Sequence, residues 1–345
     1  MTFHVGADPG AEREQTMVQL WYPAKTRADQ ARAAWLEPEV ATVQAPALAR
    51  LLGVDAASIP DLERVVSNSV AGADAAGAGV PVVVFSPGLG STRTTSTAIA
   101  EQLASDGIAV LAVDHPGDSA AIRFPDGTVR IGTRAAQFEA AASDTDRLRA
   151  LSNDATAARA RDLIGALDLL SGLNGGGTDP DGLTLPAGQA GTLDTSRVIA
   201  MGHSLGGAAA LQVAADDRRF VGAVDLDGTP WGPVATVGAD VPTLVVTSAD
   251  TDPDKDPALA RLLGLPTQDI THVAVPTARH YSFTDLEWFA PQLGDLGAEI
   301  VGHADPAELH RALGALLTAF VKESAAGKSG LVDATITDNP ILHHN

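Results

Sequence analysis

The sequence predicts an α/β fold in which helices cover both faces of a mostly parallel central sheet. Two observations support this prediction. Short apolar runs rich in β-branched residues recur along the chain, and stretches with helical spacing separate most of them. The clearest of these runs are apolar throughout, which is typical of strands that are covered on both faces. Strands that alternate with helices need crossover connections, and crossovers place neighbouring strands parallel in one sheet.

The first half of the chain contains three expected strands. Residues 17–22 form an early strand that Pro23 ends, and residues 80–86 and 108–114 are the most continuous apolar runs. A helix is expected between these two runs, over residues 94–105. This order of strand, helix and strand predicts a parallel pair.

Three segments interrupt the alternation, and we expect them as insertions within a single domain that spans residues 1–345. Residues 38–70 are rich in Ala and Leu with helical spacing. Residues 115–135 contain Pro-Gly and Asp-Gly pairs, which indicate turns and a hairpin. Residues 171–195 are rich in Gly, Asp and Pro and are expected to form an exposed loop.

The second half repeats the alternation of strand and helix. Its clearest helix is expected at residues 154–170, where Leu163, Leu167 and Leu170 fall on one side. After residue 324 the chain is polar and is expected to pack on the surface. The other expected strands are residues 198–202, 221–226, 241–247 and 270–275, and the other expected helices are residues 206–215, 256–263 and 306–322.

The composition excludes several classes of protein. Asp and Glu number 43 against 23 Lys and Arg, and the net charge of −20 argues against a nucleic-acid partner. The absence of cysteine excludes disulfide scaffolds, thiolate metal sites and a cysteine nucleophile. No apolar run approaches the roughly 18–20 residues that span a bilayer. The first ten residues lack the pattern of a signal peptide, so secretion is expected only if a leader preceded them.

The sharpest motif is Gly202-His203-Ser204-Leu205-Gly206, which fits the G-x-S-x-G pattern of a nucleophile elbow. A serine on such an elbow projects from a strained turn, and the flanking glycines let strand and helix approach each other. An apolar strand precedes the motif and a helix of small residues follows it. We therefore predict that Ser204 is a nucleophile.

A serine hydroxyl needs a base that takes its proton. On an elbow fold the partners follow in the chain order serine, acid, histidine. His280 follows the last expected strand through a short loop that should reach the carboxyl edge of the sheet. We therefore predict His280 as the base.

The residues alone leave the acid open between two strand ends. Asp227 ends the strand after the elbow, 23 residues beyond Ser204, and Asp250 ends the next strand, 46 residues beyond it. Asp252 shares the second strand end, whereas alternation along the first strand turns Asp225 to the other face. Spacing does not decide between Asp227 and Asp250.

An oxyanion hole needs two backbone N–H groups that point at the developing charge. Leu205 follows the serine and supplies one of them, and Leu89 in the glycine-rich loop after residue 86 is the expected second donor. The side chains expected to line the pocket are His115, Trp231 and Phe283. This chemistry requires no cofactor and no metal ion, and we expect none.

These segments together resemble the plasma-type (group VII, calcium-independent) platelet-activating-factor acetylhydrolases and their bacterial relatives. The resemblance runs from about residue 18 to residue 289. Its landmarks are VQLWYPA (18–24), VVVFSPGLGSTRT (82–94), LASDGIAVLAVDHPGDSA (103–120), ARARDLIGALDLL (158–170), GHSLGG (202–207), RRFVGAVDLDG (218–228) and HYSFTDL (280–286).

The resemblance implies an α/β-hydrolase fold. It implies Ser204 as nucleophile, His280 as base and Asp227 as acid, with Leu89 and Leu205 as oxyanion donors. The predicted function is a serine carboxylic-ester hydrolase that forms an acyl-enzyme on short-acyl esters, with short-chain or oxidised phospholipids among the candidates.

Three other functions remain open at this point. A lipase or cutinase-like polyester hydrolase would be favoured by the 46-residue spacing to Asp250. An acyltransferase would use the same acyl-enzyme. A non-catalytic binding protein with the hydrolase fold would keep the architecture without turnover.

Overall fold

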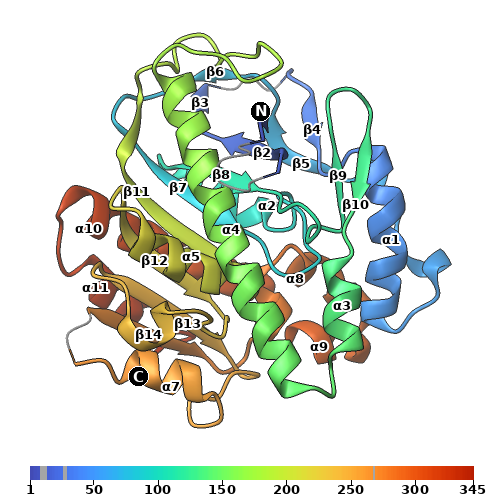
Figure 1. Ribbon diagram of the computed structural model, residues 1–345, viewed down its shortest axis with the longest axis vertical. Coiled ribbons are helices and arrows are strands. Elements are labelled where there is room, and N and C mark those ends of the chain that lie inside the picture. The colour runs from blue at the N-terminus through green and yellow to red at the C-terminus, as the bar shows by residue number, and fades with distance from the viewer. Residues whose placement is uncertain (8–13, 26–28, 267–268) are drawn as a thin grey trace.

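A nine-stranded sheet organises the molecule, which a computed structural model describes over residues 1–7, 14–25, 29–266 and 269–345 (Figure 1). The strands from β8 to β14 in sheet order run parallel, and β1, β2 and β15 are antiparallel to their neighbours. The predicted mostly parallel sheet is therefore confirmed. In sheet order the strands are β1 (Thr2–Val5), β2 (Thr16–Trp21), β8 (Ala109–Val113), β7 (Val80–Ser86), β11 (Leu193–His203), β12 (Phe220–Leu226), β13 (Thr243–Ser248), β14 (Ile270–Val275) and β15 (His343–His344).

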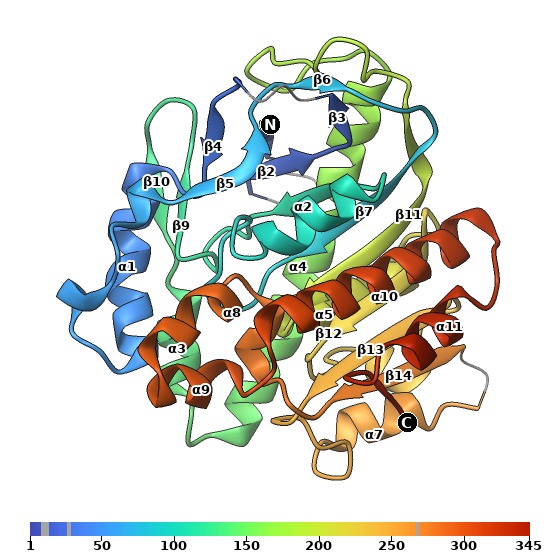
Figure 2. The same cartoon turned by 180° about the vertical axis from the view of Figure 1, so that it is seen from behind.

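Helices cover both faces of this sheet, as the two opposite views show (Figures 1 and 2). One face, turned to the viewer in Figure 1, carries α4 (Thr145–Asn174), α5 (Leu205–Asp216) and α7 (Pro257–Leu263). The other face, turned to the viewer in Figure 2, carries α2 (Thr97–Ser105), α10 (Pro306–Ala326) and α11 (Leu331–Asp338).

Strand β7 shows why the sheet is covered on both faces. Its side chains alternate, so Val82 and Val84 join the core beneath α4 and α5, while Val83 and Phe85 join the core beneath α2 and α10. All four are buried. A continuous apolar run is therefore the pattern that such a strand requires.

The long helix α4 starts earlier than residue 154, where its apolar periodicity begins. The Asp144 side chain accepts a hydrogen bond from the Arg147 N–H and so caps the helix at Thr145. Most residues in its first turns are exposed and polar, so no apolar stripe marks this part in the sequence.

The three segments expected as insertions match their patterns to different degrees. Within 38–70, helix α1 (Pro38–Leu52) and two short 3₁₀ turns precede β5 (Val66–Val70), which pairs with β4 (Arg32–Ala34). Within 115–135 the expected hairpin forms from β9 (Ala121–Arg123) and β10 (Val129–Ile131). Within 171–195, α4 extends to residue 174 and β11 begins at residue 193, so the loop is shorter than expected. The remaining elements are β3 (Ala24–Lys25), β6 (Asp74–Ala75), α3 (Arg134–Ala140), α6 (Val234–Val237), α8 (Leu286–Phe289), α9 (Asp295–Val301) and the 3₁₀ helices η4 (His280–Phe283) and η5 (Ala290–Leu293).

The polar tail does more than pack on the surface. After α10 it forms α11 and then β15, which pairs with β14 and extends the sheet by one antiparallel edge strand. Across the described parts of the chain, no helix has the length and apolar character that a membrane crossing demands.

Candidate active site

Ser204 lies on the turn between β11 and α5 with a positive φ (φ 57°, ψ −126°), which residues with a side chain rarely adopt. This conformation is costly for a residue with a side chain, so the surrounding packing must hold it. A Cβ at Gly202 would lie 2.1 Å from the carbonyl oxygen of Gly206, and a Cβ at Gly206 would lie 2.0 Å from the carbonyl oxygen of Ser86. Both glycines are therefore required for the tight elbow that presents Ser204 at the carboxyl end of the parallel strands.

His280 opens the 3₁₀ helix η4 shortly after β14 and contacts the serine. Its Nε2 lies 3.0 Å from Ser204 Oγ. A hydroxyl at this distance from a neutral imidazole is within reach of proton transfer. The imidazole is 31% exposed, so the pair is open to a substrate.

Asp227 follows β12 and contacts the second ring nitrogen of His280, with Oδ2 2.7 Å from Nδ1. Ser248 holds this carboxylate through its N–H at 2.7 Å and its hydroxyl at 2.9 Å. Burial raises the pKa of Asp227, but the hydrogen bond and electrostatic attraction of His280, together with the hydrogen bond from the Ser248 N–H, outweigh burial and leave the pKa below the ordinary value. The carboxylate is therefore ionised at neutral pH, and His280 Nδ1 carries the proton between them.

Asp250 lies near the same loop but does not contact the imidazole. Its Oδ2 accepts a hydrogen bond from the His280 backbone N–H at 2.9 Å, and its Oδ1 pairs with the Arg279 guanidinium at 2.7 Å. Of the two acids that spacing left open, the structure brings Asp227 to the ring and Asp250 to the main chain. Asp252 pairs with Lys255 at 2.9 Å.

Asp225 faces away from the histidine, as strand alternation predicts. It is fully buried, and its Oδ1 accepts a hydrogen bond from the Gly228 N–H at 2.9 Å. Burial raises the pKa of Asp225 well above its ordinary value, and the nearby Asp227 charge adds to the effect.

His203 contributes to the site although the motif gave it no role. Its Nε2 lies 2.9 Å from the carbonyl oxygen of His280, and the two rings lie 4.6 Å apart between centroids. A carbonyl oxygen can only accept, so His203 Nε2 carries the proton. Burial lowers the pKa of His203 to about 3, which keeps the ring neutral. In the sequence, only the position of His203 directly before Ser204 could have indicated that it contributes to the site.

Two backbone N–H groups lie free of hydrogen bonds beside Ser204. Among the residues that the structure describes, neither the Leu89 nor the Leu205 N–H has a hydrogen-bond partner. Leu205 opens α5, where the first N–H groups of a helix have no partner within it. A Cβ at Gly88 would lie 3.5 Å from Ser204 Cβ, so the glycine-rich loop packs against the nucleophile.

The three expected pocket residues lie in different environments. His115 is 1% exposed, and its nitrogens contact Ser86 Oγ at 2.8 Å and Asp162 Oδ2 at 2.9 Å, so it lies beneath the surface instead of on a pocket wall. Phe283 is fully buried in the core beneath α10 and does not reach an entrance. Trp231, in the loop after β12, is half-buried.

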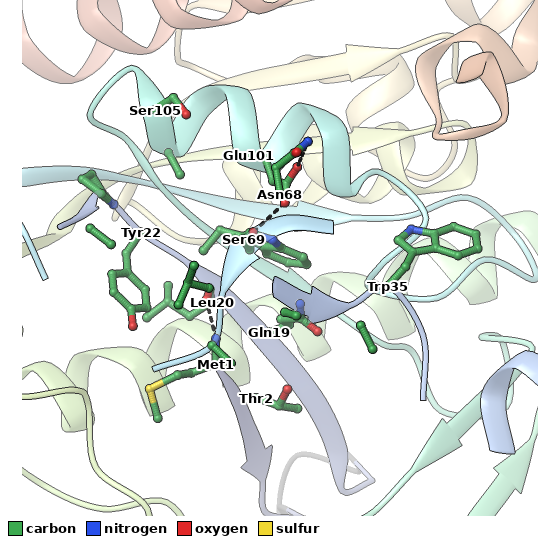
Figure 3. A pocket seen from close by; sticks show the side chains of 18 of the residues that line it. Met1, Thr2, Gln19, Leu20, Tyr22, Trp35, Asn68, Ser69, Glu101 and Ser105 are labelled. Carbon is green, nitrogen blue, oxygen red and sulfur yellow. Dashed lines mark hydrogen bonds between the residues drawn. The ribbon is translucent and has the colours of Figure 1, made fainter. Parts of the chain in front are cut away.

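Two hollows of the described structure have linings that do not include Ser204. A cavity of about 580 Å³ opens between β2, β5 and α2, where Tyr22, Trp35 and Glu101 line it (Figure 3). A second, of about 440 Å³, lies beside Arg279 and His303. Within the described ranges, no group of three or more His, Asp or Glu side chains could hold a metal ion.

Comparison with known proteins relates the chain to one family. The sequence model of the family described as "Platelet-activating factor acetylhydrolase, isoform II" matches residues 5–333. The chain is 30% identical over 220 residues to the platelet-activating factor acetylhydrolase of Cavia porcellus, a match that covers 60% of this chain and 48% of that protein. It is 28% identical over 163 residues to a probable 1-alkyl-2-acetylglycerophosphocholine esterase of Arthroderma benhamiae, covering 46% and 34%.

A solved structure matches over almost the whole chain. The ferulic acid esterase from Streptomyces cinnamoneus superposes with a TM-score of 0.73 and 28% sequence identity, and the match covers 99% of this chain and 94% of that one. The curated relatives are matched over less of their length, since the chain spans about half or less of the first of them.

Proposed function

Because the chain belongs to the platelet-activating factor acetylhydrolase, isoform II family, we propose that it hydrolyses carboxylic esters through an acyl-enzyme on Ser204. The fold is the α/β-hydrolase fold, shared with a bacterial esterase over 99% of this chain. The elbow at Ser204 is the feature of that fold that carries a nucleophile.

One observation carries the proposal: a continuous hydrogen-bonded chain joins Ser204, His280 and Asp227. The two contacts measure 3.0 Å from Oγ to Nε2 and 2.7 Å from Nδ1 to Oδ2. Ser204 Oγ attacks the ester carbonyl carbon while His280 Nε2 takes the hydroxyl proton. Asp227 keeps the other ring proton on Nδ1 and stabilises the imidazolium that forms.

The tetrahedral intermediate places a negative charge on the former carbonyl oxygen. The free N–H groups of Leu89 and Leu205 are the donors that stabilise this charge. The intermediate collapses, the bond to the leaving alkoxide breaks, and His280 gives its proton to the alkoxide. Water then repeats the sequence on the acyl-enzyme, with His280 again as base, and releases the carboxylic acid and the serine.

For the substrate we propose small, short-acyl esters. One relative is named a platelet-activating factor acetylhydrolase, another a probable 1-alkyl-2-acetylglycerophosphocholine esterase, and the structural neighbour a ferulic acid esterase. The shared chemistry is an ester with a small acyl group or a compact aromatic one. The 46-residue spacing to Asp250 would favour a lipase or polyester hydrolase, and the Asp250 carboxylate contacts the main chain of His280 and not its ring.

A substrate panel tests this proposal directly. The purified enzyme and Ser204→Ala are compared on p-nitrophenyl acetate, p-nitrophenyl palmitate emulsion, a polyester film, methyl ferulate and a short-chain phosphatidylcholine. We expect turnover of the short esters that disappears in Ser204→Ala. Faster turnover of the long-chain emulsion or the film would support a lipase or polyester hydrolase, and no turnover of any ester by the folded protein would support a non-catalytic binding protein.

A further inference from the structure

A buried polar cluster lies directly behind the glycine-rich loop and takes no part in the mechanism above. Its centre is Arg159, a buried residue of α4, and Figure 1 shows this helix in front of the sheet. The side chain is 1% exposed, which is rare for an arginine and costly unless the charge is paired. The pairing partner is Asp118, whose Oδ2 lies 2.8 Å from Arg159 Nε.

The two remaining guanidinium nitrogens bind the loop itself. Nη1 donates to the carbonyl oxygen of Pro87 and to Ser86 Oγ at 3.1 Å. Nη2 donates to the carbonyl oxygen of Gly88 at 3.2 Å. One planar group therefore holds three consecutive residues of the loop, with donor directions that its rigid fork fixes.

The Ser86 contact extends into a second chain of serine, histidine and acid. Ser86 Oγ lies 2.8 Å from His115 Nε2, and His115 Nδ1 lies 2.9 Å from Asp162 Oδ2. Arg159 donates to Ser86, so the Ser86 hydroxyl is free to donate to His115 Nε2, and His115 Nδ1–H donates to the carboxylate. Burial lowers the pKa of His115 well below its ordinary value, with the Arg159 charge adding to the effect, which agrees with this neutral ring.

The hydrogen bond from Arg159 to the Gly88 carbonyl oxygen fixes the orientation of the peptide group that carries the Leu89 N–H. In a trans peptide the C=O and the following N–H point to opposite sides, and no cis peptide occurs in the described residues. The Gly88 oxygen accepts hydrogen bonds from Arg159 Nη2 at 3.2 Å and from the Ser91 N–H at 3.1 Å, and the Leu89 N–H points to the opposite side of the peptide. That N–H has no hydrogen-bond partner among the described residues, and Gly88 packs against Ser204.

We propose that Arg159 is a positioning residue that fixes the Gly88–Leu89 peptide, and with it one donor of the oxyanion hole. This inference rests on the proposed function, because an oxyanion donor matters only if Ser204 attacks a carbonyl. Arg159 never touches substrate. Its effect is to remove the cost of reorienting the peptide when charge develops.

The test compares Arg159→Lys with the wild-type enzyme on p-nitrophenyl acetate. Lysine keeps a positive charge but cannot hold three acceptors in one plane. We expect kcat to fall about 10- to 100-fold while KM changes less than about threefold, since only the transition state loses a contact. The affinity for phenylboronic acid, which adds to the serine and gives a tetrahedral oxygen adduct, should weaken by about the same factor as kcat/KM.

Arg219→Lys is the matched control. Arg219 binds Asp168 on the same helix α4 at 2.7 Å but does not touch the loop. This variant should keep wild-type kcat and boronate affinity even if its melting temperature falls. A folded Arg159→Lys enzyme with wild-type kcat and boronate affinity would overturn the inference.

A second variant covers the case in which Arg159→Lys does not fold. Asp118→Asn leaves the guanidinium in place but removes its ionic partner, and it should lower kcat at least about threefold with little change in KM. Wild-type kcat in Asp118→Asn would overturn the inference. Ser204→Ala separates the two claims: turnover that survives Ser204→Ala refutes the proposed function, whereas turnover that needs Ser204 but not Arg159 refutes only this inference.

Discussion

The Nε2–H of His203 donates a hydrogen bond to the main-chain carbonyl of His280 at 2.9 Å. The residue next to the proposed nucleophile therefore holds the loop that carries the proposed base. Asp250 contacts the same residue, because its carboxylate accepts a hydrogen bond from the His280 backbone N–H at 2.9 Å. The position of the imidazole depends on both contacts, although neither touches the ring nitrogens.

Removing the His203 side chain should displace the base. We expect His203→Ala to lower kcat about 10-fold or more, because a shift of the imidazole by a fraction of an ångström lengthens the path of the proton. His203→Gln keeps an N–H donor on a side chain of similar reach and should retain more activity than His203→Ala. Steady-state kinetics and thermal unfolding of both variants check this prediction, and wild-type kcat in a folded His203→Ala enzyme would contradict it.

The two candidate acids predict different losses. Asp227→Asn should lower kcat by about 10³–10⁴-fold, because the amide no longer holds the imidazole with its proton on Nδ1 and no longer stabilises the imidazolium. Asp250→Asn keeps an oxygen that can accept from the His280 N–H and should cost less than about 10-fold. The kcat values of the two variants on one short ester decide the matter, and the reverse order would assign the acid to Asp250.

Glu287 makes stability depend on pH. Burial, then the charges of Asp285 and Asp305, raise the pKa of Glu287 from 4.5 to about 9. Between these two pH values the folded state holds a proton that the unfolded state has released, so the contribution of Glu287 to stability is largest below pH 4.5 and is lost as the pH rises toward 9. The slope for one such proton is at most about 1.4 kcal/mol per pH unit.

Glu287→Gln should remove the part of the slope that Glu287 contributes, while Asp285, whose pKa burial raises to about 7, keeps its own part. The variant and the wild type should have similar free energies of unfolding at about pH 5, and the variant should be the more stable of the two at about pH 8.5. Denaturant unfolding across this range measures the difference, with the exposed Glu63→Gln as control. Parallel curves for wild type and Glu287→Gln would show that Glu287 is ionised in the folded state.

Two glycines should respond in opposite ways to the same substitution. A Cβ at Gly206 would meet the carbonyl oxygens of Ser86 and Pro87 at 2.0 and 2.6 Å, so Gly206→Ala should displace the elbow from the loop, abolish activity and destabilise the fold by more than about 2 kcal/mol. A Cβ at Gly172, on α4, would meet nothing within 4 Å. Gly172→Ala should leave activity intact and stabilise the helix by up to about 1 kcal/mol. Equal effects at the two positions would contradict the packing described for the elbow.

The sequence predicts those parts of the fold where one local pattern dominates. Strands β7 and β14 occur with the predicted bounds, because β7 is a nearly continuous apolar run and β14 is rich in β-branched residues. The start of α4 is set by the Asp144 cap and its first turns face solvent, so apolar spacing does not mark it. Strand β15 has two histidines and owes its existence to the unpaired edge of β14, which no local pattern records.

In the candidate site too, the sequence predicts the residues that a local motif marks and misses those that depend on long-range contacts. The elbow motif and chain order point to Ser204 and His280, but two strand ends approach the same loop, so spacing cannot separate Asp227 from Asp250. The role of His203 depends on its contact with His280, 77 positions along the chain. The role of Arg159 depends on its contacts with the glycine-rich loop, such as Gly88, which lies 71 positions away. His115 follows the carboxyl end of β8, where a pocket residue is expected, but the buried Asp162 on α4 binds its ring below the surface.

The most direct test of the central claim is labelling by a fluorophosphonate, which reacts with a serine only when a neighbouring base activates it. We predict one label per chain, located on Ser204 by peptide mass analysis, with no labelling in Ser204→Ala and strongly slowed labelling in His280→Ala. A folded wild-type protein that stays unlabelled, or that is labelled equally well after Ser204→Ala, would contradict the account.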